Sequence, residues 1–307
     1  MKEYQLSVEE EYDNERIDRY VCSVLADLSR SYIQKIIDDG GVTVNGRTVK
    51  ASYKVKPGES IRVITPDSVI PDILPEDIPI DILFEDEDVL VINKPKGMVV
   101  HPAPGHYEHT LVNAVMFHCK SLSGINGVMR PGIVHRIDKD TTGSVIICKN
   151  DKAHASIAKQ LEEHTIDREY LAIVTGVIDS DGTVDKPIGR STSDRKKMCV
   201  KPDGKRAVTH YEVIGGNDKF TLVKCRLETG RTHQIRVHMA SIGHPIAGDT
   251  VYGNGTKTPT DTFGQALHAY ILGFTHPSTG DFVRTVAPPP EYFEKFIEIM
   301  DIEHSLW

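Results

Sequence analysis

Apolar residues near the N-terminus recur at every third or fourth position, at Ile17, Tyr20, Val21, Val24, Leu25 and Leu28. This spacing predicts an amphipathic helix over residues 16–28. A second short helix follows, with Ser29 or Ser31 as its N-cap and Gly40 as its stop. The Asn-Gly pair at 45–46 predicts a β-hairpin over residues 42–49, ahead of a strand at 61–64. Together these elements predict a compact α+β module over residues 14–65.

Beyond this module, proline recurs at Pro66, Pro71, Pro75 and Pro79, which predicts an extended, semi-rigid linker over residues 66–79. Strand-like apolar runs dominate the remaining domain, residues 80–307, at 80–84, 89–92, 144–148, 170–174, 208–214, 220–227, 269–274 and 282–286. Helical patterns are fewer, at 110–118, 152–163, 231–242 and 290–300. Many strands with few intervening helices predict an α+β fold, with a mixed, mainly antiparallel sheet and flanking helices.

Composition narrows the class of protein. The 307 residues are 39% hydrophobic and 26% charged, which is ordinary for a soluble globular chain. No apolar run approaches the ~18 residues of a membrane-spanning helix, and residues 1–5 lack the apolar core of a signal peptide. The five cysteines are odd in number, widely spaced and free of any CxxC motif, which is typical of reduced thiols. We therefore expect a cytoplasmic protein with no membrane partner.

The formal net charge of −8 argues against a nucleic-acid partner at first sight, but the charges are unevenly distributed. Residues 66–88 hold nine acidic side chains and no basic one. Residues 190–206 hold seven basic side chains against two acidic ones. The acidic residues are concentrated in a linker and a turn, which leaves room for basic faces elsewhere. A solvated face without a partner explains such a charge run equally well.

Residues 132–143 concentrate the charged chemistry of the chain. They place two carboxylates, two cations and an imidazole directly before the apolar run 144–148, which is expected to be a buried strand. A loop that enters a strand can hold a side chain at the rim of a cleft. Taken alone, the segment has a simpler interpretation, in which Asp138 and Asp140 cap turns while Arg136 and Lys139 are solvated.

The sequence His-Arg-Ile-Asp at 135–138 closely resembles the catalytic signature of the RluA-type pseudouridine synthases, where His-Arg-Leu-Asp is usual and the aspartate is the nucleophile. Ile137 is a conservative departure from that pattern. Further segments resemble family blocks in the family's order, at residues 94–102, 168–172, 230–238, 248–253 and 267–269. Several blocks in this order are far more specific than any one of them.

The resemblance implies an RNA pseudouridine synthase, an isomerase that flips a uridine out of its stack and needs no cofactor and no metal. It implies that Asp138 is the catalytic carboxylate and that Tyr170 stacks on the extruded uracil. Arg236 is expected to hold Asp138 ionised, because a nearby cation lowers the pKa of an aspartate, with Arg231 as the rival for that role. Whether Asp138 attacks the sugar, adds to the base or only stabilises charge stays open.

Substrate contacts are expected from two regions. In the catalytic domain the candidates are His135, Arg136 and Arg231. The front module resembles a small RNA-binding module named after a small-subunit ribosomal protein, here called S-four-like. Its exposed cations, with Arg19, Lys35 and Arg47 as the predicted RNA contacts and Arg16, Arg30 and Lys50 beside them, would bind phosphates. A purely structural cap is the alternative.

RluD-like members of the family share such a front module and act on large-subunit (23S) rRNA. The resemblance therefore implies a structured rRNA substrate, with tRNA as an open alternative. The number of target uridines and the oligomeric state stay open.

Two other classes of protein compete with this interpretation. The 14 histidines could suggest a metalloenzyme, but His233 and His238 are five residues apart and no HxxxH, HExxH or CxxC motif occurs. A non-catalytic RNA-binding protein would be expected to have lost one of the three catalytic candidates, and all three are present. Product formation on transcribed rRNA would discriminate between the latter class and an active synthase.

Overall fold

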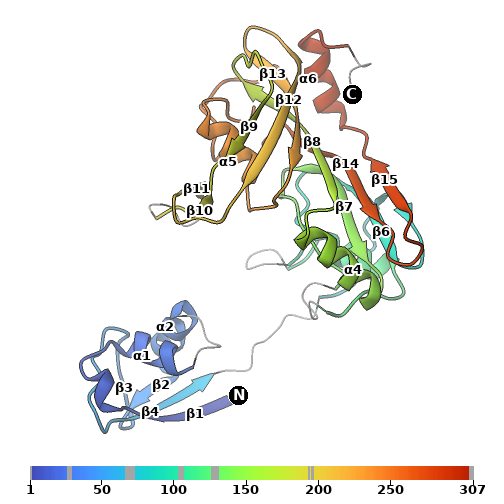
Figure 1. Ribbon diagram of the computed structural model, residues 1–307. Helices are drawn as coiled ribbons and strands as arrows, with labels where there is room; N and C mark the ends of the chain where they lie inside the picture. Colours follow the sequence, from blue (N-terminus) through green and yellow to red (C-terminus); the bar gives the residue numbers. More distant parts are fainter. Residues whose placement is uncertain are drawn as a thin grey trace. The chain divides into compact units, whose positions relative to one another are not determined.

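The computed structural model describes residues 2–25, 30–65, 73–102, 107–125, 131–192, 194 and 197–303 (Figure 1). The chain divides into two compact units, Met1–Pro71 and Asp72–Trp307.

The first unit combines a four-stranded antiparallel sheet with two helices. Its strands are β1 (Lys2–Ser7), β2 (Val42–Val44), β3 (Arg47–Thr48) and β4 (Ser60–Thr65), in the order β1-β4-β2-β3. A 3-10 turn, η1 (Glu10–Tyr12), precedes α1 (Ile17–Val24) and α2 (Arg30–Asp38). The small α+β module predicted from the sequence is confirmed. Its sheet begins at β1, ahead of the expected range 14–65.

The end of α2 follows from Gly40. Its φ of 76° is a left-handed conformation that favours glycine, and it lets the amides of Gly40 and Gly41 bond back to the carbonyls of Ile37 and Ile36 at 3.0 and 2.8 Å. The stop predicted at Gly40 is therefore confirmed. The first helix ends at Val24, earlier than expected, and residues 26–29, including the N-cap candidate Ser29, lie outside the described residues. Ser31, the other candidate, lies inside α2.

The second unit is built on one long mixed sheet. Its strands are β5 (Asp81–Glu85), β6 (Val89–Lys94), β7 (Thr142–Cys148), β8 (Asp167–Thr175), β9 (Gly182–Asp185), β12 (Val208–Gly216), β13 (Phe220–Leu227), β14 (Leu267–Thr275) and β15 (Phe282–Val286). Their order is β5-β6-β7-β14-β8-β13-β12-β9, with β15 paired to β14. Only the β7–β14 pair of this described sheet is parallel, so the predicted mixed, mainly antiparallel sheet is confirmed.

Helices and a small ribbon complete this unit. The helices are α3 (Leu111–His118), α4 (Asp151–Glu162), α5 (Gln234–Ser241) and α6 (Glu291–Ile299), and the ribbon pairs β10 (Ile188–Arg190) with β11 (Met198–Val200). The sequence did not predict β1, β9, β10 or β11. The later part of the expected linker packs on this unit, because Ile73 is only 6% exposed in its core and Asn113 donates to the Leu74 carbonyl.

Strand β14 joins two half-sheets, β5-β6-β7 on one side and β8-β13-β12-β9 on the other. The parallel contact pairs His268 with Thr142 and Ala269 with Gly143. Gly143 has a φ of 107°, and a Cβ there would lie 2.2 Å from the Ala269 carbonyl oxygen, so only glycine fits. His268 Nδ1 accepts from the Thr142 hydroxyl and Nε2 donates to the Ala287 carbonyl, while burial lowers its pKa to about 4. A neutral His268 therefore connects β14 to β7 where the two half-sheets meet.

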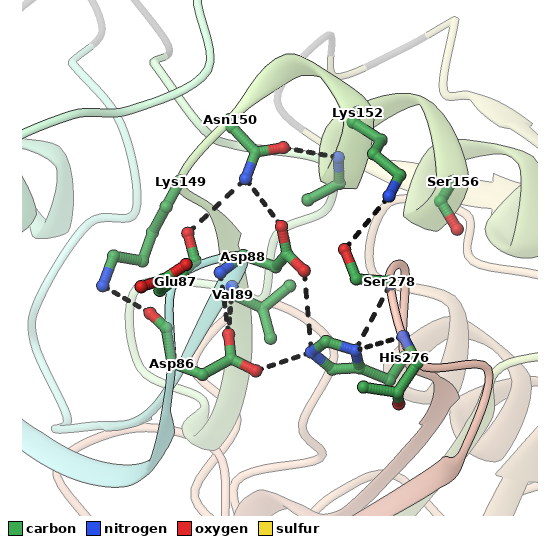
Figure 2. A network of polar contacts seen from close by, with 12 residues as sticks. Asp86, Glu87, Asp88, Val89, Lys149, Asn150, Lys152, Ser156, His276 and Ser278 are labelled. Atoms are coloured by element: carbon green, nitrogen blue, oxygen red, sulfur yellow. Dashed lines mark hydrogen bonds and ion pairs between the residues drawn. The ribbon is translucent and has the colours of Figure 1, made fainter.

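The turn after β14 is fastened to the turn between β5 and β6, as Figure 2 shows. His276 Nδ1 accepts from the backbone amides of Ser278 and Thr279, so in the neutral ring Nε2 carries the proton and donates to Asp86 at 2.6 Å. Asn150 caps α4 through the Ala153 amide and donates to Asp88 at 2.8 Å. The His276–Asp86 bond therefore ties the end of β14 to the first half-sheet, and the Asn150 bonds hold the start of α4 against the same turn.

Candidate active site

The loop that carries Asp138 leads into β7 and is held in place by the side chain of Lys94. Lys94, at the end of β6, is fully buried, and its Nζ donates to the carbonyls of Pro95, Met98 and Lys139 at 2.8–3.0 Å. Burial lowers the pKa of Lys94 to about 7, while the three carbonyls accept all three ammonium protons. The Lys139 carbonyl also accepts from the Gly97 amide, so the peptide between Lys139 and Asp140, one residue beyond Asp138, is held twice.

Arg236, in the first turn of α5, lies between two carboxylates. Its Nη1 donates to Asp138 Oδ2 at 2.7 Å, and its Nε and Nη2 form a fork with Asp249 at 2.7 and 3.0 Å. The side chains of Arg236, Asp249 and Asp138 are 6%, 0% and 18% exposed. Burial opposes the charge of Arg236, but the bonds to Asp249 and the field of Asp138 outweigh it and raise its pKa. Of the two arginines predicted as partners of Asp138, the structure places Arg236 against it.

Asp249 follows α5 in the chain and positions Arg236. Burial disfavours its charge, but the hydrogen bonds and charge of Arg236 outweigh burial and lower the pKa of Asp249. The amides of Val251 and Tyr252 also donate to Asp249 Oδ1, at 2.8 and 3.0 Å. Asp249 lies in the block 248–253, but its role was not predicted from the sequence. The presence of an aspartate in a motif does not reveal which buried cation its carboxylate binds in the fold.

His233 approaches Asp138 from the start of α5. Tyr252 accepts from the Met198 amide through its hydroxyl, which lies 2.8 Å from His233 Nδ1 and donates to it in the neutral tautomer that is protonated at Nε2. In that tautomer the protonated Nε2 lies 3.8 Å from Asp138 Oδ1. Burial is the main cause that lowers the pKa of His233, which favours this neutral form. From the sequence, His233 was considered only as a metal ligand, and this contact with Asp138 was not predicted.

Tyr170, on β8, lines the same pocket as Asp138, Arg136, His233 and Arg236. Its side chain is 9% exposed, and burial raises the pKa of its hydroxyl, which is therefore protonated at neutral pH. The structure thus brings together Asp138, Tyr170 and Arg236, the three predicted catalytic residues.

The predicted RNA contacts of the second unit differ in their freedom. Arg136 is exposed at the mouth of the pocket. Arg231 also lines the pocket, and its Nε donates to the Arg206 carbonyl at 3.0 Å. His135 uses Nε2 to accept from the Ile146 amide at 3.0 Å, and burial lowers its pKa to about 3. The structure therefore shows His135 fixing the loop against β7 with that nitrogen.

The first unit carries the other predicted contacts. Arg19, Lys35 and Arg47 are exposed, with Arg19 3.7 Å from Glu15. Arg16 and Arg30 are 40% and 43% exposed, and both bind the buried carboxylate of Asp18, which is 0% exposed.

Within the described residues, no three His, Cys, Asp or Glu side chains are grouped so that they could hold a metal ion. Over the same ranges, no helix has the length and apolar character needed to span a membrane.

Comparisons with known proteins agree with this geometry. The family described as RNA pseudouridylate synthase matches residues 88–241, and the S4 domain matches residues 15–61. The chain is 54% identical over 299 residues to the uncharacterized RNA pseudouridine synthase YlyB of Bacillus subtilis, covering 97% of this chain and 98% of that protein. It is 46% identical over 311 residues to the ribosomal large subunit pseudouridine synthase D of Zymomonas mobilis, covering 98% of each. The solved structure of human RNA pseudouridylate synthase domain containing 1 is similar, with a TM-score of 0.58 and 26% identity over 74% of this chain and 87% of that one.

Proposed function

Because this chain belongs to the RluA-type family of RNA pseudouridine synthases, which are isomerases, and carries an RNA-binding S4 domain, we propose that it converts specific uridines of large-subunit rRNA to pseudouridine. Support for rRNA comes from relatives named ribosomal large subunit pseudouridine synthase D, at 46% identity in Zymomonas mobilis and 42% in Nitrosomonas europaea. The first relatives match over nearly their full length, front module included, which favours a shared class of substrate.

The observation that carries the proposed chemistry is the unequal use of the two Asp138 oxygens. Oδ2 is bound by Arg236 at 2.7 Å, whereas among the described residues Oδ1 has only the more distant His233, at 3.8 Å. Arg236 holds the carboxylate in place, and Oδ1 is left for the substrate. Asp138 is therefore the proposed nucleophile, acting on the nucleotide that enters the pocket beside Tyr170.

The reaction balances without an added reagent. The bond between N1 of uracil and C1′ of ribose breaks, the base turns, a bond forms between C5 and C1′, and the proton of C5 is replaced by one on N1. As the nucleophile, Asp138 Oδ1 forms an ester bond to C1′ as the N1–C1′ bond breaks, and this ester bond breaks again when C5 attacks C1′. The Tyr170 ring covers the base, and its protonated hydroxyl can hydrogen-bond to it. Flipping the uridine costs a few kcal/mol, which phosphate contacts of the first unit offset.

The test is a map of pseudouridines in total RNA with and without the gene, followed by reaction of the purified protein with transcribed large-subunit rRNA. We expect sites in that rRNA to disappear without the gene and to form in vitro with the wild-type protein. Sites lost only from tRNA would overturn the rRNA assignment, and no product on any RNA would overturn the activity itself.

A further inference from the structure

Arg168, near the start of β8, is a buried cation for which the described residues provide no counter-ion. It is 8% exposed, its Nε has no hydrogen-bond partner among those residues, and Nη2 makes one long bond, 3.4 Å, to the Glu228 carbonyl. Within the part of the chain that the structure describes, no carboxylate forms an ion pair with it. Burial lowers the pKa of Arg168, and the charge of Arg231 adds to this effect. An unpaired buried charge is costly, so its persistence points to a partner that arrives from outside.

The surroundings of Arg168 are shaped for such a partner. Arg168 and Tyr170 are two residues apart on β8 and share one face of the strand. Arg168 lines a cavity of about 480 Å³ that also contains Arg136 and Arg231, with the exposed Glu162 as the one carboxylate among its lining residues. This cavity adjoins the pocket of Asp138, because both are lined by Arg136, Tyr170, Leu227 and Arg231.

Gly230 makes room for the guanidinium. A Cβ at this position would lie 2.6 Å from Arg168 Nη1, so any larger residue would displace the arginine. The block 230–238 therefore contains Gly230, which leaves this space, as well as Arg231 and Arg236. Three arginines against one carboxylate leave an excess of positive charge, and a planar guanidinium matches the geometry of a phosphate.

We propose that Arg168, with Arg136 and Arg231, binds a phosphodiester of the RNA next to the flipped uridine. The proposal rests on the proposed function, because RNA brings a phosphate on each side of the uridine that enters the adjoining pocket. The phosphate acts as the counter-ion of Arg168. In return, Arg168 fixes the position of the RNA strand relative to Tyr170. Base identity is not read at this site.

Arg168→Met tests the site, with Arg226→Met as the matched control. Arg226 is exposed on β13 and lies directly opposite Glu169 in the register of β13 and β8. It therefore belongs to the opposite face of the sheet from Arg168. Replacing an unpaired buried charge by an apolar side chain should leave the melting temperature equal or raise it. With transcribed large-subunit rRNA we expect about tenfold weaker binding. The slope of log affinity against log salt should become shallower by about 0.7 to 0.9. Arg226→Met should change neither the affinity for the rRNA nor the slope of log affinity against log salt.

Neutral methylphosphonates identify the phosphate itself. In a synthetic stem-loop with a target uridine, one methylphosphonate beside that uridine should weaken binding to the wild type and have no further effect on Arg168→Met. Measured in the Asp138→Asn background, this result needs no turnover, so it stands or fails independently of the proposed activity. In the active enzyme, Arg168→Met should raise KM more than it lowers kcat. A lower melting temperature for Arg168→Met, or equal methylphosphonate effects in both proteins, would overturn the proposal.

Discussion

Each unit of the molecule buries an aspartate against arginine, and the two clusters are built in opposite proportions. In the first unit one carboxylate is shared by several donors: Asp18 accepts from Arg16, Arg30 and Gln34 at 2.6–3.2 Å. In the second unit one guanidinium is shared by two carboxylates, Asp138 and Asp249. The Asp18 side chain is 0% exposed, whereas that of Asp138 is 18% exposed and faces a pocket.

The difference shows what separates a structural ion pair from a reactive one. Both oxygens of Asp18 accept charged donors, so this carboxylate can do no more than join α1 to α2. Asp138 shares Arg236 with Asp249, which takes two of the three bonds and keeps the guanidinium in place. Within the described residues, one oxygen of Asp138 is consequently left without a close donor. An excess of acceptors over donors, rather than burial alone, marks the reactive cluster.

The largest expected effect is that of Asp138→Asn on turnover. The amide is nearly isosteric but cannot act as a carboxylate nucleophile, so we expect a loss of about 10⁴-fold or more, or over about 5 kcal/mol of barrier. The RNA dissociation constant and the melting temperature should stay close to those of the wild type. Single-turnover assays with transcribed rRNA measure the loss, and turnover within tenfold of the wild type would contradict the role of Asp138.

Arg236→Met should unbalance the reactive cluster from the other side. It leaves Asp249 buried and Asp138 partly buried with no cation between them, which should cost about 3–5 kcal/mol of stability as well as activity. Adding Asp249→Asn should recover part of the stability and none of the activity, because the most deeply buried charge is removed. Denaturant unfolding measures both variants. Strictly additive losses in the double variant would exclude the proposed coupling.

Asp18→Asn should have a smaller effect that is confined to the first unit. Arg16 and Arg30 are 40% and 43% exposed, so water can solvate them once their partner is neutral, and we expect a loss of about 1–3 kcal/mol. Hydrogen exchange should accelerate in α1 and α2 and stay unchanged in β7 and β8. A kcat well below that of the wild type would show that this cluster is not merely structural.

The same aspartate predicts a dependence on pH. Burial opposes the charge of Asp18, but the bonds from Arg16, Gln34 and Arg30 outweigh it and lower its pKa in the folded state. Its contribution is therefore present above the ordinary aspartate pKa of about 3.9 and is lost as the pH falls below that value. Asp18→Asn should lack this acid-sensitive part of the stability, which unfolding curves in acid would reveal.

The smallest expected effect separates two tyrosines. Tyr170→Phe keeps the ring and loses the hydroxyl beside Asp138, so turnover should fall by more than tenfold, above about 1.4 kcal/mol of barrier, with RNA binding near normal. Tyr20→Phe is the control, because the hydroxyl of Tyr20 donates to the Ser7 carbonyl at 3.0 Å inside the first unit. It should cost about 1 kcal/mol of stability and leave kcat unchanged. If Phe works as well as Tyr at position 170, the ring alone is needed.

Elements with a strong apolar period were predictable, and short polar strands were not. The runs that became β6, β7, β8 and β13 are buried along most of their length, so hydrophobicity alone locates them. Strand β9 buries only Val184 and exists because β12 pairs with it, which no local pattern reveals. Strand β1 did carry a signal, since Tyr4 and Leu6 alternate with exposed residues, but the sequence analysis made no use of it.

In the site, motifs located the residues but not their partnerships. The choice between Arg231 and Arg236 depends on α5 starting at Gln234, after His233 adopts a left-handed φ of 57°. That turn leaves Arg231 outside the helix, where it bonds the Arg206 carbonyl, and puts Arg236 in the first turn beside Asp138. The role of Asp249 as a partner of Arg236, and the lack of a described counter-ion for Arg168, depend on contacts between distant segments. Sequence spacing does not encode such contacts.

The position of β14 sets the time at which this active site can exist. During synthesis, Asp138 leaves the ribosome with the first half-sheet, and Tyr170 and Arg236 follow with the second. The two halves have no joining strand until residues 267–275 emerge and insert between β7 and β8. Such long-range pairing forms late in folding. We expect nascent chains stalled before Leu267 to form no pseudouridine, although every proposed catalytic residue has already been made. The newly made enzyme would then remain inert toward the rRNA of the ribosome that produces it until β14 has been made.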